Sequence, residues 1–361
     1  MTLRDSRGEL SRRTFLRATG AAAGTAAAAT WLVEADAAPE VGAATPPAGF
    51  KPLHLPGRIV KVTKGNDFPS LMQKNQLWPK PEVARSMLEA ALTKFTGASS
   101  LEAALGKFVH KDDIVAVKVN GIAGQSGATM AVNYELILPV VEGLLKLGVP
   151  AKNLIVYEQF GSYLAGTRVG KGKNKLPEGV KAVVHSNGDA PMKAIKVFEN
   201  IKTKYVRQLT EATAVIDMTQ IKDHSICGYT GCLKNMTHGS IINPQDHHRH
   251  QASPQIAVLY AHEILKSRVR LHITDGFKII YDQGPLDKNP KRRIPHGAVY
   301  VATDPVAMDT IGTQIVDHAR KENGLKTLAQ AGREPTYITK AAELGLGVHD
   351  MNKIRMQEVA I

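Results

Sequence analysis

Lysine and histidine residues stand where several apolar segments of this chain end, and they could serve an acid–base reaction there. Lys118 and Lys222 each follow an apolar run, and Lys234 lies in a glycine-rich segment. An ammonium group in such a place is costly unless a carboxylate or a bound anion neutralises it. We therefore expect the three lysines to hold the negative charge of a small anionic ligand. His224, whose imidazole titrates near neutral pH, would transfer the proton.

Aspartate and asparagine residues complete the candidate site. Asp275 or Asp304 would orient the imidazole of His224. Two alternatives remain open at this point. The lysines could form structural ion pairs with the aspartates, and Asp304, which precedes Pro305, could simply cap a helix. The catalytic candidates are Lys118, Lys222, His224 and Asp275, and the ligand-binding candidates are Asn120, Lys234, Asn235, Asp304 and Asp309.

The spacing of Lys222 and His224 predicts a neutral histidine. Alternate residues of a strand point to the same side, so the ammonium of Lys222 would lie beside the imidazole of His224. A neighbouring positive charge disfavours the imidazolium form. His224 would then be able to act as a base or to bind a metal at pH 7.

Metal binding is a second hypothesis for the same region, because histidine and cysteine are dense between residues 224 and 250. Imidazole and thiolate suit zinc, copper or iron, although the spacing matches no zinc-finger template. The two cysteines could instead form a disulfide, and residues 247–250 could be a solvated loop. The cofactor is unknown, with a transition metal as one candidate. The candidate metal ligands are His224, Cys227, Cys232 and His238.

These residues are spread over a chain in which strand-like and helix-like segments alternate. Such alternation predicts an α/β fold, with a mostly parallel sheet and helices on both faces. Ligands bind at the carboxyl ends of the strands in folds of this kind, which is where the candidate residues stand. Strands are predicted at 58–63, 114–119, 153–158, 180–185, 214–220, 269–274 and 298–302, and helices at 82–95, 134–146, 254–266 and 305–320.

Five segments, spread over roughly residues 58–345, resemble the family known as domain of unknown function 362. The resemblance implies a fold and a polar edge, and it implies no reaction. Some members of that family carry iron–sulfur modules, but a four-cysteine iron–sulfur cluster is not possible within one chain that has two cysteines. The segments are Val117-Lys118-Val119-Asn120, Lys222-x-His224, Gly231-x-x-Lys234-Asn235-x-x-x-Gly239, Gly284-Pro285 and Asp304-Pro305-Val306-Ala307-Met308-Asp309.

The amino-terminal segment is typical of an export signal. The pair Arg12-Arg13 precedes Phe15 and Leu16, an Ala/Gly-rich run follows, and Ala35-Asp36-Ala37 fits a cleavage site. We expect a twin-arginine signal peptide over residues 1–37, a linker over 38–57 and a single α/β domain over 58–361. The protein would use the twin-arginine translocation machinery and would be periplasmic. The alternative is an ordinary amphipathic helix.

Charge and composition restrict the function further. The formal net charge is +13, which suits nucleic acid, anionic lipid or acidic small ligands. We do not expect nucleic acid, because the basic residues are dispersed, aromatic residues make up only 5% and no nucleic-acid-binding motif is present. No apolar stretch after the signal is long enough to span a membrane. The sequence therefore predicts an exported enzyme or binding protein for a small anionic ligand, or else a metal- or redox-cofactor-binding protein that uses residues 224–250.

Overall fold

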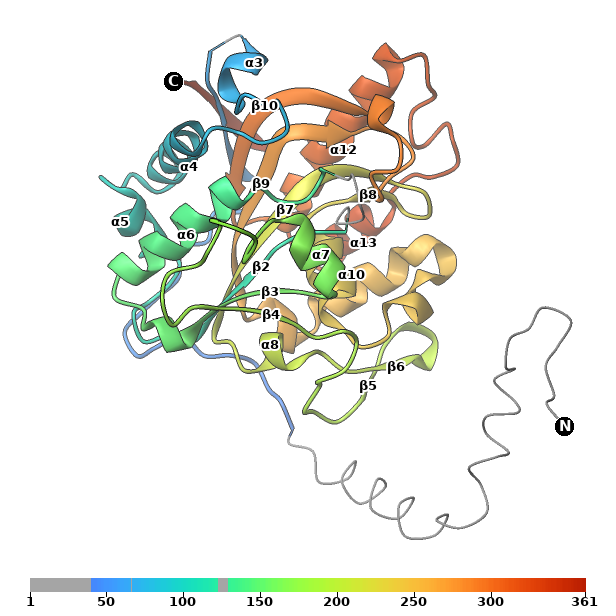
Figure 1. Cartoon of the computed structure of the whole chain (residues 1–361). Coiled ribbons are helices and arrows are strands. Elements are labelled where there is room, and N and C mark those ends of the chain that lie inside the picture. Colours follow the sequence, from blue (N-terminus) through green and yellow to red (C-terminus); the bar gives the residue numbers. More distant parts are fainter. Residues whose placement is uncertain (1–39, 66, 123–128) are drawn as a thin grey trace, which may run out of the picture. The chain divides into compact units, whose positions relative to one another are not determined.

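The computed structural model describes residues 40–65, 67–122 and 129–361 (Figure 1). The predicted signal peptide lies outside these residues. The fold considered below comprises residues 42–190 and 194–361. Among the helices of the described residues, none combines the length and the apolar character that crossing a membrane requires.

A nine-stranded sheet forms the centre of this fold, in the order β11-β1-β10-β9-β7-β2-β3-β4, with β8 paired to β7. The pairings β9-β7-β2-β3-β4 and β1-β11 are parallel, and β10 is antiparallel to both of its neighbours. The strands are β1 (Arg58–Thr63), β2 (Val115–Lys118), β3 (Leu154–Glu158), β4 (Lys181–Val184), β7 (Ala214–His224), β8 (Gly228–Thr230), β9 (Val269–Ile280), β10 (Arg293–Ala302) and β11 (Arg355–Ala360), and a separate pair is β5 (Ile195–Lys196) with β6 (Lys202–Thr203).

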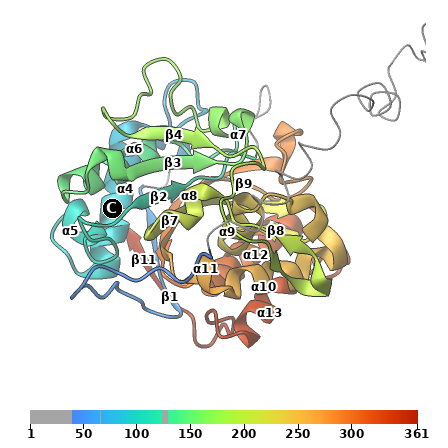
Figure 2. The same cartoon turned by 90° about the horizontal axis from the view of Figure 1, so that it is seen from below.

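Helices cover both faces of the sheet (Figures 1 and 2). Side chains of a strand alternate between the two faces. Thus Val60 and Val62 of β1 pack in the core under α4, α5 and α6, whereas Ile59 packs in a second core under α12. The predicted α/β class and the two-faced packing are confirmed. The helices are α3 (Phe68–Leu71), α4 (Pro81–Thr96), α5 (Leu101–Leu105), α6 (Tyr134–Lys146), α7 (Gly161–Gly166), α8 (Arg207–Thr210), α9 (Cys232–Thr237), α10 (Ser253–Ala261), α11 (Glu263–Lys266), α12 (Pro305–Glu322) and α13 (Tyr337–Glu343).

Some elements differ from their predicted bounds. Strand β7 continues to His224, four residues beyond the predicted end at Gln220, because its last residues are buried polar side chains that an apolar pattern does not detect. The helix predicted at 254–266 is broken into α10 and α11. The break lies at His262, whose backbone is extended and whose Nδ1 accepts a hydrogen bond from Ile264 N. This histidine therefore caps a new helix.

The segment predicted as a linker is part of the fold from Gly42 onward. The backbone N–H of Leu53 donates to Lys107 O, and that of Leu55 donates to the hydroxyl of Thr303. Both leucine side chains pack at the edge of the main core. An Ala/Pro/Gly-rich composition is compatible with an extended segment, and here the extended segment is held against the domain by hydrogen bonds and apolar contacts.

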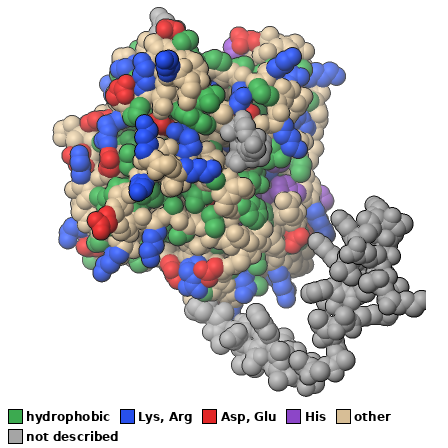
Figure 3. All heavy atoms as spheres, viewed as in Figure 1, with side chains coloured by type: hydrophobic (Ala, Val, Ile, Leu, Met, Phe, Trp, Pro, Cys, Tyr) green, Lys and Arg blue, Asp and Glu red, His purple; other side chains and the backbone are tan. Residues whose placement is uncertain are grey.

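Charged side chains are mixed on the face seen in Figure 3. Lysine and arginine residues are distributed among aspartate and glutamate residues, with apolar patches between them. This distribution on one face matches the dispersed lysines and arginines of the sequence.

Candidate functional site

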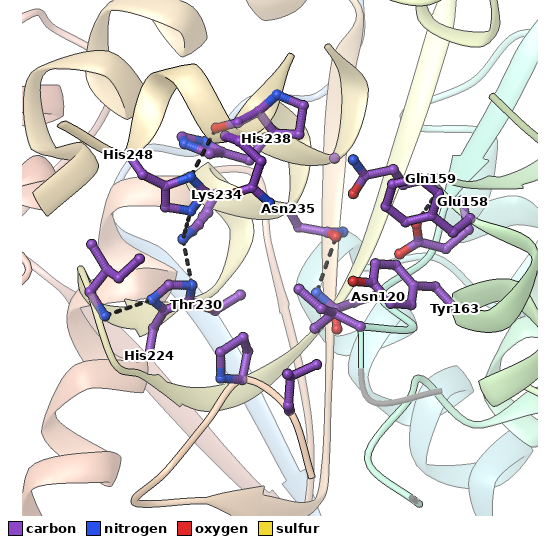
Figure 4. Close-up of a pocket in the computed structure, with 18 of the residues that line it drawn as sticks. Asn120, Glu158, Gln159, Tyr163, His224, Thr230, Lys234, Asn235, His238 and His248 are labelled. Atoms are coloured by element: carbon purple, nitrogen blue, oxygen red, sulfur yellow. Dashed lines mark hydrogen bonds between the residues drawn. The ribbon is translucent and has the colours of Figure 1, made fainter. Parts of the chain in front are cut away.

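A cavity of about 280 Å³ opens where β2, β3 and β7 end (Figure 4). Its position agrees with the general rule that ligands bind outside the carboxyl ends of parallel strands. Helix α9 and the β7–β8 turn form its other wall. Six of the predicted site residues line this cavity: Lys118, Asn120, His224, Lys234, Asn235 and His238.

Lys118 forms an ion pair with a carboxylate that was not among the predicted site residues. Its Nζ lies 3.2 Å from Glu158 Oε1, and both side chains are almost fully buried. The same Nζ donates to Val119 O at 2.6 Å and to Asn235 Oδ1 at 3.2 Å. Glu158 is the last residue of β3, so the strand-end rule that selected Lys118 could also have selected Glu158. The alternative interpretation, a structural ion pair, is met by Glu158 and not by one of the aspartates named for it.

Lys222 lies behind the cavity rather than in its wall. Its Nζ is fully buried and donates to Asn120 Oδ1 at 2.7 Å. Burial lowers the pKa of this lysine to about 7, because the charged form loses its hydration. Lys222 is therefore separated from the cavity by the amide of Asn120, and we correct its placement from the wall to the layer behind it.

Asn235 connects the two sides of the site. Its Oδ1 accepts hydrogen bonds from Lys118 Nζ and from Asn120 Nδ2, each at 3.2 Å. Its Nδ2 donates to Asp217 Oδ1 at 2.6 Å. These three partners orient the amide, because its oxygen faces two donors and its nitrogen faces an acceptor, so Asn235 is a fixed junction in which both polar atoms have partners.

His224 and Lys234 meet on the opposite wall. Lys234 Nζ lies 2.7 Å from His224 Nε2, 3.2 Å from His248 Nε2 and 3.3 Å from Cys227 Sγ. The rings of His224 and His248 are stacked, with centroids 5.9 Å apart. His248 thus belongs to the site, although residues 247–250 had a solvated loop as one interpretation. No local signal of the sequence indicates this contact.

The pKa of His224 is lowered to about 2, first by burial and second by the charge that Lys234 can carry. The sequence also predicted a neutral histidine, but it attributed this to Lys222. That attribution is wrong, because Lys222 Nζ is hydrogen-bonded to Asn120 and the lysine in contact with His224 is Lys234. Strand alternation alone does not show which long side chain reaches a ring.

Asp275 and Asp304 have structural roles away from the cavity. Asp275 Oδ2 accepts hydrogen bonds from both the backbone N–H and the side-chain amide of Asn133, which precedes α6. Asp304 caps α12 through Ala307 N at 2.9 Å and also accepts from Gly57 N. The capping alternative for Asp304 is confirmed. Neither carboxylate contacts His224, which corrects the expectation that one of them orients it.

Asp309 holds α9 in place instead of lining the cavity. Its two carboxylate oxygens accept from the backbone N–H groups of Cys232 and Leu233, at 2.6 and 3.1 Å. A Cβ on Gly231 would lie only 2.2 Å from Asp309 Oδ1, and a Cβ on Gly239 would lie 2.8 Å from Lys118 Cε. Gly231 and Gly239, the first and last residues of the predicted glycine-rich segment, therefore let Asp309 and Lys118 approach the backbone at the two ends of α9 closely.

The four predicted metal ligands do not gather around one point. Cys227 contacts Lys234, whereas Cys232 packs in the core under α12, and both are free thiols, so the predicted disulfide alternative is wrong as well. Among the described residues, one triad could hold a metal ion: Asp217, Cys232 and His272, whose ligand atoms lie within 4.8 Å of one another. Only Cys232 was in the predicted set. Two members of this triad already contact each other, because His272 Nδ1 lies 2.8 Å from Asp217 Oδ2.

The fold and the cavity define an α/β protein with a polar pocket at the carboxyl ends of its strands. A scan against protein families matches residues 115–314 to the family described as Domain of unknown function (DUF362). The chain belongs to this family, as the five segments predicted. No curated protein matches the chain in sequence.

Proposed function

We propose that this protein binds a small anionic ligand in the cavity at the strand ends and acts on it there. One observation carries the proposal: Lys118 and Lys234, from opposite walls, line a cavity of about 280 Å³ together with the amides of Asn120 and Asn235. Glu158 is the one carboxylate among the described lining residues. A third buried lysine, Lys222, stands directly behind Asn120.

The size and chemistry of the cavity restrict the ligand. The cavity is near the lower end of the usual volume range of ligand pockets, which suits a small metabolite. The buried charge of Lys118 can stabilise a negative charge in the cavity without reorganising, which is the property that both an anion-binding site and an oxyanion-stabilising active site need. Neutral imidazoles in the same cavity supply proton acceptors and donors.

Ligand binding is tested by thermal unfolding of the mature protein with a panel of small carboxylates and phosphates. A ligand that binds only the folded state should stabilise it by about 2.7 kcal/mol at a hundredfold excess over Kd. The double variant Lys118→Met/Glu158→Gln removes both charges of the buried pair, so neither is left unpaired, and it should lose this stabilisation.

The matched control is Lys353→Met, because the side chain of Lys353 is 75% exposed and far from the lining residues in sequence. It should keep the full stabilisation. Stabilisation that survives in the double variant, or no stabilisation by any anion of the panel, contradicts the proposal. Turnover of a stabilising ligand then separates an enzyme from a binding protein.

We also propose that residues 1–37 are a twin-arginine signal peptide and that the folded domain is periplasmic. The pair Arg12-Arg13 and the Ala/Gly-rich run after it support this proposal. Changing both arginines to lysine should leave the precursor in the cytoplasm, as measured by cell fractionation. The variant Arg4→Lys/Arg7→Lys, outside the pair, should be exported normally. Normal periplasmic accumulation of the first variant argues against this route.

Metal binding is a second candidate function, and the triad of Asp217, Cys232 and His272 favours it. This set differs from the predicted one in all but Cys232. Elemental analysis of protein purified from its native host decides between the candidates. Stoichiometric metal that is lost in Asp217→Asn would favour metal binding over the anion site.

A further inference from the structure

The side-chain nitrogen of Lys234 is enclosed by two histidines and a cysteine. Lys234 is 5% exposed, and its Nζ contacts His224 Nε2, His248 Nε2 and Cys227 Sγ. No carboxylate is among these three partners, which is unusual for a buried lysine. The protons on the partners determine which form of the amine fits.

His224 presents a proton to Lys234. Its Nδ1 accepts two backbone hydrogen bonds, from Ile226 N at 3.0 Å and from Cys227 N at 3.3 Å. A ring nitrogen that accepts from N–H groups carries no proton, and in a neutral imidazole the proton is then on the other nitrogen. His224 Nε2 is therefore an N–H group that points at Lys234 Nζ, 2.7 Å away.

His248 and Cys227 present acceptors to the same nitrogen. His248 Nδ1 lies 2.9 Å from Pro244 O, which can only accept, so this ring nitrogen carries the proton and Nε2 has the lone pair. The thiol of Cys227 donates to Tyr229 O at 3.3 Å, which leaves its sulfur free to accept from Lys234.

A neutral amine satisfies all three contacts. It donates one N–H to His248 Nε2 and one to Cys227 Sγ, and its lone pair accepts the N–H of His224. An ammonium group has three protons and no lone pair, so one proton would face the N–H of His224. This conflict remains even if Cys227 is a thiolate, because it depends on the two backbone bonds to His224 Nδ1.

We propose that Lys234 is a resting neutral amine that forms an imine with a carbonyl carbon of the bound ligand. The ligand class is a small oxo acid, with its negative charge toward Lys118 and its carbonyl toward Lys234. The choice of an anionic ligand rests on the proposed function, whereas the neutral amine rests on the hydrogen-bond pattern alone.

Burial acts in the same direction as the hydrogen bonds. It lowers the pKa of Lys234, because the ammonium form loses its hydration, and it raises the pKa of the Cys227 thiol. Desolvation in a water-poor pocket is a known way to make a lysine nucleophilic.

The proposed step is balanced by the residues around the amine. The lone pair of Nζ leaves the His224 N–H and attacks the carbonyl carbon, so that a C–N bond forms and the carbonyl π bond opens onto oxygen. His224 Nε2–H can then donate to that oxygen. His248 Nε2 passes the two N–H protons of the amine to that oxygen one after the other. The first transfer gives a carbinolamine, and the second lets the oxygen depart as water while the nitrogen lone pair forms the C=N bond of the imine. No oxidant or reductant takes part.

Reductive trapping tests the inference. The mature protein is incubated at pH 7 with glyoxylate, a small anionic aldehyde, and sodium cyanoborohydride, and the modified lysines are mapped by peptide mass spectrometry. We expect Lys234 to be alkylated faster than Lys111 and Lys353, whose side chains are 63% and 75% exposed. The ratio of the labelling rate of Lys234 to that of the exposed lysines should fall about tenfold for each unit by which the pH rises. The reason is that an exposed lysine has a pKa near 10.4, so its neutral, reactive fraction increases about tenfold per pH unit below that value.

Acetaldehyde, which is neutral, separates the two parts of the proposal. Labelling of Lys234 by both aldehydes at equal rates supports the amine and contradicts the anionic ligand. Labelling of the exposed lysines alone overturns the imine while leaving the thermal-shift test of ligand binding unaffected.

The ¹⁵N resonance of Lys234 Nζ gives a second test, which does not depend on whether a reagent can reach the amine. The resonance is assigned by its loss in Lys234→Met. An ammonium resonance at pH 7 overturns the neutral amine.

Discussion

Replacing Asn235 with leucine should lower the free energy of unfolding by about 3–5 kcal/mol, because it leaves several buried polar groups without a partner. Asn120 Nδ2 and Asp217 Oδ1 would each lose a hydrogen bond, and Lys118 would lose one of its acceptors. Leucine is close to asparagine in size, so the cost comes from the polar groups rather than from a cavity. Urea denaturation at pH 7 measures the change.

The control for this variant is Met236→Leu on the same short helix. Met236 is also fully buried, but the substitution conserves volume and involves no polar partner, so it should cost less than about 1.5 kcal/mol. If the two variants are equally stable, the amide junction contributes little, and the side chains around it must find other partners at no cost.

A second large loss is expected for Asp113→Ala, again about 3–5 kcal/mol, because it leaves a buried guanidinium without its carboxylate. Asp113 Oδ2 accepts from Arg270 Nη1 at 2.7 Å, and its Oδ1 accepts from Arg270 Nη2 at 3.1 Å. The two side chains are 0% and 4% exposed. The pair joins the segment before β2 to the start of β9.

The adjacent residue provides a matched control. The side chain of Asp112 is 62% exposed, and its ion pairs with His110 and Lys111 lie at the surface. Asp112→Ala should therefore change stability by less than about 1 kcal/mol. A comparable loss in both variants would show that the helix–strand connection, and not the buried pair, is the sensitive feature.

The elements that carry the site could be predicted because their apolar patterns are strong. Strand β1 and helix α6 have the predicted bounds, and the ends of β2, β3 and β7 converge as the parallel topology requires. The same rule placed Lys118, Asn120 and Asn235 in one cavity. Convergence of strand ends follows from topology, and topology follows from the alternation of strands and helices.

The partners of those residues could not be predicted. Lys118 forms its ion pair with Glu158 rather than with an aspartate. Asp309 accepts a hydrogen bond from the backbone N–H of Leu233 in α9, 76 residues earlier in the sequence. Such pairings depend on how far each side chain extends in the folded protein, and the spacing of residues along one strand does not show this. His248 lies in the 3₁₀ segment Pro244–Ala252 and contacts Lys234 of α9, although nothing in the composition of this segment distinguishes it from a surface loop.

The two walls of the cavity come from different stretches of the chain. All three partners of Lys234 lie within residues 224–248, whereas Asn120 and Glu158 are at the ends of β2 and β3. Substitutions in the second wall can therefore change which ligand fits without disturbing the protons around the amine. Under the proposed imine chemistry, reactivity and selectivity would therefore depend on different stretches of the chain, so that substitutions at Asn120 or Glu158 would change the accepted ligand while the lysine chemistry stayed the same.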